Sequence, residues 1–224
     1  YHRGVRLNFE PGYIAFALEQ SLRRLRTDHV DLYQLHNPPA EMMGDPATYE
    51  SLELLKAEHK IEHYGVSIHE PMEGLLCLDA GKPETLQLPF SLLHQDWIDR
   101  LFDAARKANV GIIAREPLGN GFLTGALRGD AQFPAGDIRS HWPLSMVAGR
   151  SAIAERLRFL MRESRTQAQA ALRFVLAFPE VSVAIPGAKT AAQVVENLGA
   201  SDSPPLTGNE LAQARQLYAR EFGM

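Results

Sequence analysis

The 224-residue chain lacks the features that would place it in several large classes of protein. It has one cysteine, Cys77, so no internal disulfide can form, and a reducing, cytoplasmic setting is expected. No run of lysine and arginine exceeds two residues and the formal net charge is −4, which argues against a nucleic-acid partner. No apolar run approaches the ~18 residues that a membrane span needs, so no membrane partner is expected either.

The histidines lack the grouping of a metal centre, and no metal is expected. His59 and His63 stand four residues apart, but a helix-to-strand boundary lies between them, so they do not share a helical face. The chain also lacks an initiator methionine and the apolar region of a signal peptide, and it opens with Tyr1. We therefore expect that a segment upstream of residue 1 is missing from this sequence.

What is present is an alternation of strand-like and helix-like segments. Five short runs rich in Val, Ile and Leu are bounded by turn residues, which is typical of buried parallel strands. They cover residues 30–35, 61–67, 85–90, 111–116 and 181–188. Because the alternation extends over the whole chain, 1–224, it favours one α/β domain with a parallel sheet.

Helical patterns fill the intervals between these runs. One helix is expected to begin near Pro11, a favoured first helical position, with Ile14 and Leu18 on its apolar face. Further helices are indicated around residues 49–55 and 101–108, and over 151–163, 166–177 and 207–222.

Two pairs of residues have the spacing of a capping box. Thr190 with Gln193 predicts the start of a short helix, and Thr207 with Glu210 predicts the start of the C-terminal helix, 207–222. The longest irregular stretch is residues 120–150, a length that is usually functional or disordered. Its large side chains that could line a pocket are Phe133, His141 and Trp142.

Two closures of such a sheet are possible, an open doubly wound sheet and a barrel. The Gly-x-Gly-x-x-Gly fingerprint of the open dinucleotide-binding fold is absent after the first run. Polar residues instead mark the C-terminal ends of the strands, where a barrel has its active site. These ends read His36-Asn37, Ser67-Ile68-His69, Gln87, Arg115-Glu116 and Gly187-Ala188-Lys189. The pattern favours a barrel.

Four segments resemble motifs of one enzyme family, the aldo-keto reductases of the bacterial type. Residues 21–36 (SLRRLRTDHVDLYQLH) and 65–67 (GVS) resemble the entry to the fourth barrel strand and the end of the next one. Residues 115–125 (REPLGNGFLTG) resemble the loop over the cofactor pyrophosphate, and 185–197 resembles the adenosine-binding segment. Their order and spacing span nearly the whole chain, which is far more specific than any single motif.

The resemblance implies a (β/α)8 TIM barrel that binds NADP(H) and transfers a hydride between the nicotinamide and a carbonyl or alcohol carbon. The runs present here would be strands four to eight, so the chain would hold an incomplete barrel of the five C-terminal βα units. The family's catalytic set is an Asp, a Tyr, a Lys and a His. Only the His maps onto this chain, at His36, and the other three are expected upstream of residue 1.

On this resemblance, His36 bonds the substrate carbonyl oxygen and stabilises the charge that develops there. The alternative is a structural histidine bonded to a neighbouring backbone group. Ser67 and Gln87 match positions that hold the nicotinamide carboxamide, although Gln87 could instead cap a loop. Ile68 replaces an Asn that is frequent in the family, so one hydrogen bond to the cofactor is expected to be lost.

The segment after the fourth run would bind the nicotinamide and the pyrophosphate. Arg115 stands where many members stack an aromatic ring, and a guanidinium plane can also stack. An ion pair with Glu116 is its alternative. Backbone N–H groups that would face the pyrophosphate come from Leu118, Gly119 and Asn120.

The segment after the fifth run would bind the adenosine half of the cofactor. Gly187, Ala188 and Lys189 precede a helix N-terminus, which suits a phosphate, and Lys189 could pair with the 2′-phosphate. Gln193 replaces the Arg that clamps this phosphate in many members, so NAD(H) stays open as cofactor, and Gln193 also has an alternative role in the capping box. The residues that would face the adenine are Glu196 and Asn197.

Two functions remain open from the sequence. The first is an NADP(H)-dependent oxidoreductase acting on a small carbonyl or alcohol whose identity the sequence does not give. The second is a naturally truncated relative without reductase activity, which acts as a binding module or uses His36 for non-redox acid/base chemistry. Five strands cannot close an eight-stranded barrel, so a truly truncated chain is expected to form a homo-oligomer across its open edge.

Overall fold

A computed structural model describes residues 7–81 and 83–222. Its five strands are β1 (Val30–His36), β2 (Ile61–Ser67), β3 (Thr85–Pro89), β4 (Gly111–Arg115) and β5 (Val181–Ile185). They are hydrogen-bonded in the order β1-β2-β3-β4-β5, and among the described residues this sheet does not close on itself. The pairs β1–β2 and β2–β3 are parallel. All five strands expected from the sequence are thereby confirmed, as an incomplete barrel sheet.

The chain divides into two compact units. The first consists of the described residues up to Leu88 together with Asp96–Ile113, and the second consists of Pro89–Gln95 with the described residues from Ala114 on. The first unit therefore contains β1, β2 and most of β3, and the second contains β5.

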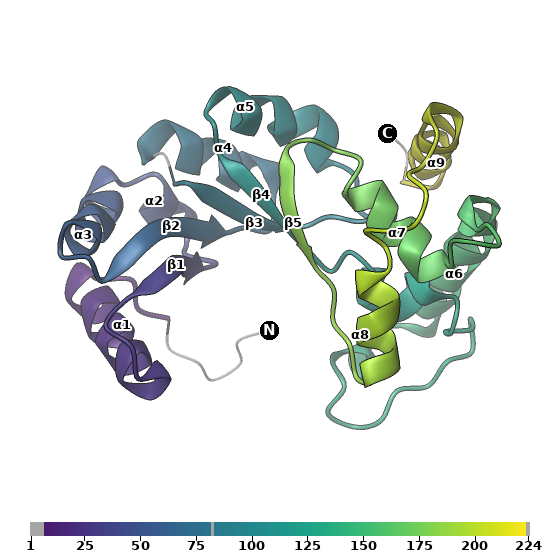
Figure 1. Cartoon of the computed structure of the whole chain (residues 1–224), viewed down its shortest axis with the longest axis horizontal. Coiled ribbons are helices and arrows are strands. Elements are labelled where there is room, and N and C mark those ends of the chain that lie inside the picture. The colour runs from purple at the N-terminus through teal and green to yellow at the C-terminus, as the bar shows by residue number, and fades with distance from the viewer. Residues whose placement is uncertain (1–6, 82, 223–224) are drawn as a thin grey trace. The chain divides into compact units, whose positions relative to one another are not determined.

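The helices of the first unit cover its strands (Figure 1). They are α1 (Pro11–Leu25), α2 (Ala40–Met43), α3 (Pro46–Ala57), α4 (Pro71–Ala80), a π-helical turn at Ile98–Phe102, and α5 (Asp103–Lys107). The Asp45 side chain accepts the Ala47 N–H at the start of α3, and Leu52 of this helix is fully buried where α3 packs on β2. Cys77 of α4 is also fully buried, and burial raises the pKa of its thiol to about 11.

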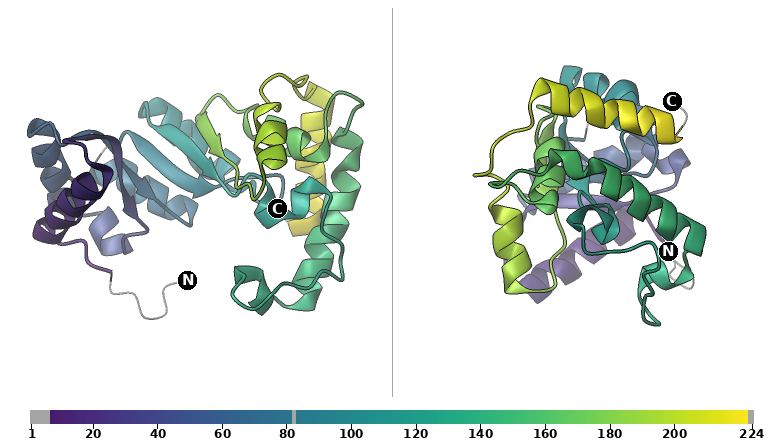
Figure 2. Two further views of the ribbon diagram at one scale, coloured as in Figure 1. Left: turned by 60° about the horizontal axis from the view of Figure 1, so that its bottom comes forward. Right: turned by 90° about the vertical axis from the view of Figure 1, so that its right-hand side faces the viewer.

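The second unit is mostly helical. Its helices are α6 (Leu144–Arg156), α7 (Gln167–Val175), α8 (Ala191–Leu198) and α9 (Gly208–Phe222), with shorter 3-10 turns at Gly119–Thr124, Ile138–His141 and Leu157–Leu160. The capping box at the start of α9 is confirmed, since Thr207 and Glu210 each bond the other's backbone N–H. Helix α9 lies beside α6, to which an ion pair between Arg156 and Glu221 joins it (Figure 2).

The stretch 120–150 is less irregular than expected from the sequence. Helix α6 begins at Leu144, not at residue 151, and a 3-10 turn at Ile138–His141 precedes it. Trp142-Pro143 has the appearance of a loop in the sequence, but proline is favoured at the entry of a helix, and Val147 is buried in the second turn. The irregular backbone is therefore concentrated between Gly125 and Asp137.

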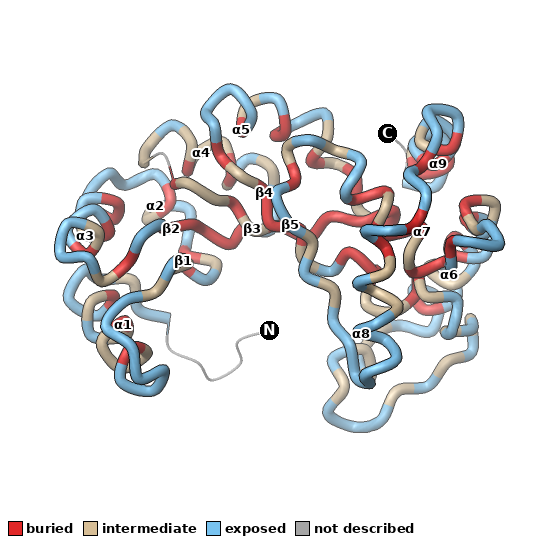
Figure 3. The backbone as a smooth tube through the Cα atoms, in the orientation of Figure 1, coloured by how far each residue is buried: buried red, intermediate tan, exposed pale blue. Residues whose placement is uncertain are grey.

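Apolar side chains of two elements of the second unit are exposed to solvent. Helix α8 has no buried residue, and Val195 and Leu198 are 70% and 68% exposed (Figure 3). On β5, Val183 and Ile185 are exposed as well. No helix within 7–81 or 83–222 is long and apolar enough to cross a membrane.

Candidate functional site

Three of the expected site residues form one row across the first unit. The parallel register places His36 of β1 opposite Ser67 of β2, and Ser67 opposite Gln87 of β3. His36 is exposed, Ser67 is buried and Gln87 is half-buried. Since His36 and Ser67 are the last residues of their strands, the row lies at the C-terminal end of the sheet, where barrel enzymes bind their substrates.

Two residues without a predicted role bond members of this row. Ser67 Oγ donates to Asn37 Oδ1 at 3.0 Å, and Gln87 Nε2 donates to Gln34 Oε1 at 3.2 Å. Asn37 has a φ of 53°, in the left-handed region that asparagine tolerates better than most residues. Gln34 is two residues from His36 on β1, so both side chains point to the same face. The signal for Gln34 was available in the sequence, as a polar residue inside an apolar strand.

Ile68 belongs to the core. Its side chain is fully buried, and its backbone N–H donates to the Gln87 carbonyl oxygen at 2.8 Å. A Cβ placed on Gly74 of α4 would lie 3.0 Å from Ile68 Cδ1, which shows how closely helix and strand approach there. The residue that replaces the family's frequent Asn therefore contributes packing.

In the second unit, a carboxylate joins two of the expected cofactor residues. Arg115 Nη1 donates to Glu116 Oε1 at 2.9 Å, and Asn120 Nδ2 donates to Glu116 Oε2 at 2.7 Å. The ion pair that the sequence left as an alternative for Arg115 is therefore formed. It fixes the guanidinium of Arg115, the last residue of β4, against the Glu116 carboxylate.

A tight turn follows β4 at Leu118–Gly121. Both central residues have positive φ, 55° for Gly119 and 57° for Asn120, and the Gly121 N–H donates to the Leu118 carbonyl oxygen at 3.0 Å. A Cβ on Gly119 would lie 2.9 Å from Leu93 Cδ1, so the position needs glycine for both conformation and space. The Gly119 N–H, one of those expected to face the pyrophosphate, donates to the Glu116 carbonyl oxygen at 2.8 Å.

The third group of expected residues surrounds the start of α8. Gly187, Ala188 and Lys189 are exposed, and a Cβ on Gly187 would meet no heavy atom within 4 Å. Gln193 Oε1 accepts the Lys189 N–H at 2.6 Å, while the Gln193 N–H donates to Thr190 Oγ1 at 3.2 Å. The cap is formed as expected, but the amide of Gln193 binds the residue before the N-cap. Gln193 thereby holds the backbone of Lys189, whose side chain ends in the ammonium group.

The two residues expected to face the adenine have partners inside the second unit. Thr166 Oγ1, at the start of α7, donates to Glu196 Oε1 at 2.7 Å. Asn197 Nδ2 donates to the Gly187 carbonyl oxygen at 3.5 Å. Glu196 thus joins α8 to α7, and Asn197 lies against the exposed Gly187–Lys189 segment.

The aromatic residues of 120–150 contact other side chains of the same unit. Trp142 stacks on Phe122 with ring centroids 6.0 Å apart and planes 9° from parallel, and the Arg150 guanidinium lies 4.7 Å from the Trp142 centroid. Phe133 lies under the Arg139 guanidinium at 4.2 Å. Trp142 and Phe133 of the stretch 120–150 are therefore packed against side chains of the second unit.

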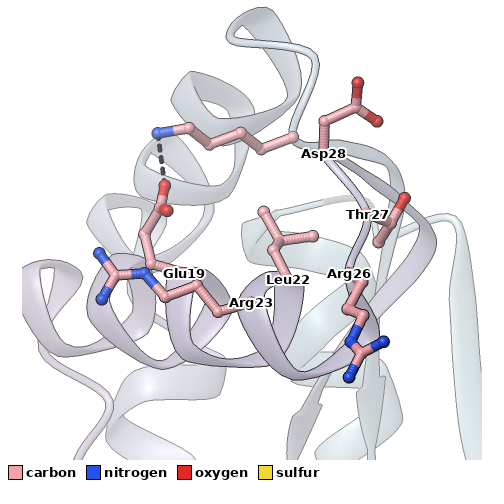
Figure 4. A pocket seen from close by; sticks show the side chains of 7 residues that line it. Glu19, Leu22, Arg23, Arg26, Thr27 and Asp28 are labelled. Atoms are coloured by element: carbon pink, nitrogen blue, oxygen red, sulfur yellow. Dashed lines mark ion pairs between the residues drawn. The ribbon is translucent and has the colours of Figure 1, made fainter.

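An open cavity of about 630 Å³ lies elsewhere in the first unit. Its lining residues are Glu19, Leu22, Arg23, Arg26, Thr27, Asp28 and Lys60 (Figure 4). Lys60 Nζ, which pairs with Glu19 at 2.8 Å, immediately precedes β2. The cavity therefore lies at the N-terminal ends of the strands, opposite to the row of His36, and that end of a barrel serves stability. In the described ranges, no three His, Cys, Asp or Glu side chains group as metal ligands.

Comparisons with known proteins agree on one family. The profile described as Aldo/keto reductase family matches residues 3–219. An uncharacterized oxidoreductase of Bacillus subtilis, YqkF, is 29% identical over 93% of this chain and 66% of its own length. The aldo-keto reductase yakc [NADP(+)] of Schizosaccharomyces pombe is 30% identical over 87% of this chain and 59% of its own length. The chain thus spans about two thirds or less of these relatives.

Solved structures of this family superpose well. The glycerol dehydrogenase AKR11B4 from Gluconobacter oxydans gives a TM-score of 0.81 at 26% identity and covers 96% of this chain, which corresponds to 66% of that structure. An aldo/keto reductase from Klebsiella pneumoniae, in complex with NADP and acetate, gives a TM-score of 0.68 at 29% identity, with 92% and 64% coverage. Since the family profile spans nearly all of the sequence, the chain belongs to the aldo/keto reductase family.

Proposed function

We propose that the protein is an NADP(H)-dependent oxidoreductase of the aldo-keto reductase type, acting on a small carbonyl or alcohol. The observation that supports this most strongly is the register of β1, β2 and β3, which brings His36, Ser67 and Gln87 into one row at the C-terminal end of the strands. A hydrogen-bonding imidazole beside two carboxamide-binding groups is the arrangement that hydride transfer to a carbonyl needs.

The chemistry of the second unit fits a dinucleotide. Its exposed Lys189, the open space at Gly187 and the turn at Gly119 suit phosphate groups, which favour cations and close backbone approach. Ser67 and Gln87, which belong to the first unit, would hold the carboxamide of the nicotinamide. Arg115 of the second unit would lie on the nicotinamide ring. When bound, the cofactor supplies or accepts the hydride.

The remaining assigned residues would hold the other end of the cofactor. The backbone N–H groups of Leu118 and Asn120 would bind the pyrophosphate, and Gly119, whose own N–H donates to Glu116, would allow its close approach. Lys189 would pair with the 2′-phosphate. Ala188 would offer its backbone, while Glu196 and Asn197 would border the adenine. Because Gln193 is neutral, NAD(H) is the second candidate cofactor.

His36 would donate a ring N–H to the substrate carbonyl oxygen. This bond orients the carbonyl and stabilises the negative charge that grows on the oxygen during reduction. In the family, protonation of this oxygen belongs to a Tyr whose pKa a Lys lowers, with an Asp alongside, and none of the three maps onto this chain. Reduction therefore requires these groups in addition to His36.

The test is turnover by the full-length polypeptide that contains this sequence. We expect it to consume NADPH with at least one member of a panel of small aldehydes and ketones, and H36Q to lower kcat by about a hundredfold. H29Q is the matched control, because His29 immediately precedes the same strand at its opposite end, and it should leave kcat unchanged. No turnover across the panel, or equal rates for both variants, would contradict the proposal.

A second candidate is nucleotide binding without reduction. It would need only the exposed Lys189 and the turn at Gly119, and no proton donor. The two candidates differ in one outcome: a protein that binds NADPH but never oxidises it, whatever the carbonyl compound, is a binding module.

A further inference from the structure

Arg139 reaches back across the second unit to the turn after β4. Its Nη1 donates to the Asn120 carbonyl oxygen at 2.8 Å, although the two residues are 19 positions apart. Its other nitrogens bond Asp137, with Nε to Oδ1 at 2.9 Å and Nη2 to Oδ2 at 2.7 Å, and its plane lies on Phe133. Side chains of Arg139 and Asp137 are only 15% and 14% exposed. Each of the three guanidinium nitrogens therefore donates at least one hydrogen bond.

This contact fixes a backbone conformation that the sequence alone disfavours. Asn120 (φ 57°, ψ 29°) and Gly121 (φ 93°, ψ −7°) are consecutive left-handed residues, and for Asn120 this costs roughly 1 kcal/mol. The peptide plane between them is held at both ends, because its oxygen accepts from Arg139 and its N–H donates to Leu118. The Asn120 side chain is held separately by Glu116. Arg139 is thus the partner of the Asn120 carbonyl oxygen within this turn.

The same ion pair is electrostatically linked to the start of α8. Hydrogen bonds from Arg139 hold the pKa of the Asp137 carboxyl well below its usual range, and the charge of Lys189 adds to the effect. Asp137 therefore lies within the electrostatic range of Lys189, the cation expected at the 2′-phosphate.

We propose that Arg139 is a positioning residue for dinucleotide binding: it holds the Asn120 peptide so that the turn 118–121 presents its backbone to the pyrophosphate. This inference rests on the proposed cofactor site. It adds that, without the Arg139 hydrogen bond, the turn relaxes from its left-handed conformation and binds the pyrophosphate poorly.

The experiment compares two conservative variants of the full-length protein by titration calorimetry. R139K keeps the charge opposite Asp137, but a single ammonium lacks the fork that bonds both Asp137 and Asn120. R128K is the matched control, because Arg128 is an exposed arginine of the same stretch. The ligands are NADP+ and adenosine 2′-monophosphate, which lacks the pyrophosphate.

We expect R139K to raise the Kd for NADP+ about tenfold, the effect of losing one hydrogen bond from a charged donor, and to change the Kd for adenosine 2′-monophosphate less than about twofold. R128K should bind both ligands like the unaltered protein. An unchanged NADP+ Kd in R139K would overturn this inference alone, and so would equal weakening of both ligands, which indicates general damage to the unit. If the unaltered protein binds no nucleotide, the cofactor site and this inference fail together.

Discussion

Gly119 occupies the most confined position of the turn that follows β4. Its φ is 55°, and a Cβ there would lie 2.9 Å from Leu93 Cδ1 and 3.3 Å from the Leu123 side chain. G119A should therefore lower the free energy of unfolding by about 1–3 kcal/mol, from backbone strain and overpacking combined. Urea denaturation followed by circular dichroism measures this loss.

Gly149 offers a control of opposite sign. It lies inside α6, is exposed, and has no heavy atom within 4 Å of the position a Cβ would take. Since alanine is the better helix former, G149A should raise the free energy of unfolding by up to about 1 kcal/mol. Equal effects of the two substitutions would show that the turn is not confined as described.

At the scale of single residues, the sequence predicted positions better than contacts. His36, Ser67 and Gln87 could be named because strand ends are readable from apolar runs that stop at polar residues. Asn37 could not be assigned its bond to Ser67, since this contact depends on a left-handed backbone and on the strand register. The contact of Arg139 could not be predicted for a similar reason, because its partner Asn120 is 19 residues away across an irregular stretch.

At the scale of elements, one buried ion pair attaches α9 to the segment before α7. The Arg165 side chain is 1% exposed and donates to Glu210 Oε1 at 2.7 Å, to the Leu160 carbonyl oxygen and to the carbonyl oxygens of Pro204 and Pro205. E210Q would leave this guanidinium buried without a counter-charge and should cost about 3–5 kcal/mol of unfolding free energy. Chemical denaturation measures this loss of unfolding free energy. E163Q is the control, because Glu163 is exposed and its substitution should change the unfolding free energy little.

The same carboxylate predicts a dependence on acid. Burial raises the pKa of Glu210, but the Thr207 N–H and the Arg165 charge outweigh this, and the pKa lies below its ordinary value of 4.5. A lowered folded-state pKa adds stability above the unfolded value, and this stability is lost as pH falls through the folded pKa. The unaltered protein should thus lose unfolding free energy below pH 4.5, and E210Q should lose less. If the unfolding free energy of E210Q fell equally steeply below pH 4.5, Glu210 would be excluded as the source of the pH dependence.

Helices were harder to predict than strands. The strands are short, continuous apolar runs, and each was located to within a few residues. Helix α4 gives a weak pattern in the sequence, because its buried positions include the small Gly74 and Cys77, which make no clear apolar stripe. The start of α6 was misplaced because Trp142-Pro143 resembles a turn, whereas here proline immediately precedes the helix.

At the scale of the whole molecule, family membership depends on the order of motifs, which no local pattern contains. The five strands follow the chain order of a (β/α)8 barrel, and the chain spans 59–66% of the curated relatives compared above. The family's Asp, Tyr and Lys have no match in it. The residues proposed to bind the cofactor all lie within this chain, so cofactor binding is the property to measure first.

The most direct measurement is the fluorescence of NADPH titrated with the purified protein. We expect a saturable change in nicotinamide emission that excess NADP+ reverses, with NADH binding more weakly because Lys189 would meet no 2′-phosphate. We also expect H36Q to leave the Kd within about twofold of the unaltered value, since His36 is proposed to face the substrate and not the cofactor phosphates. An emission that stays unchanged at saturating protein would contradict the assignment of this chain as a nicotinamide-nucleotide site.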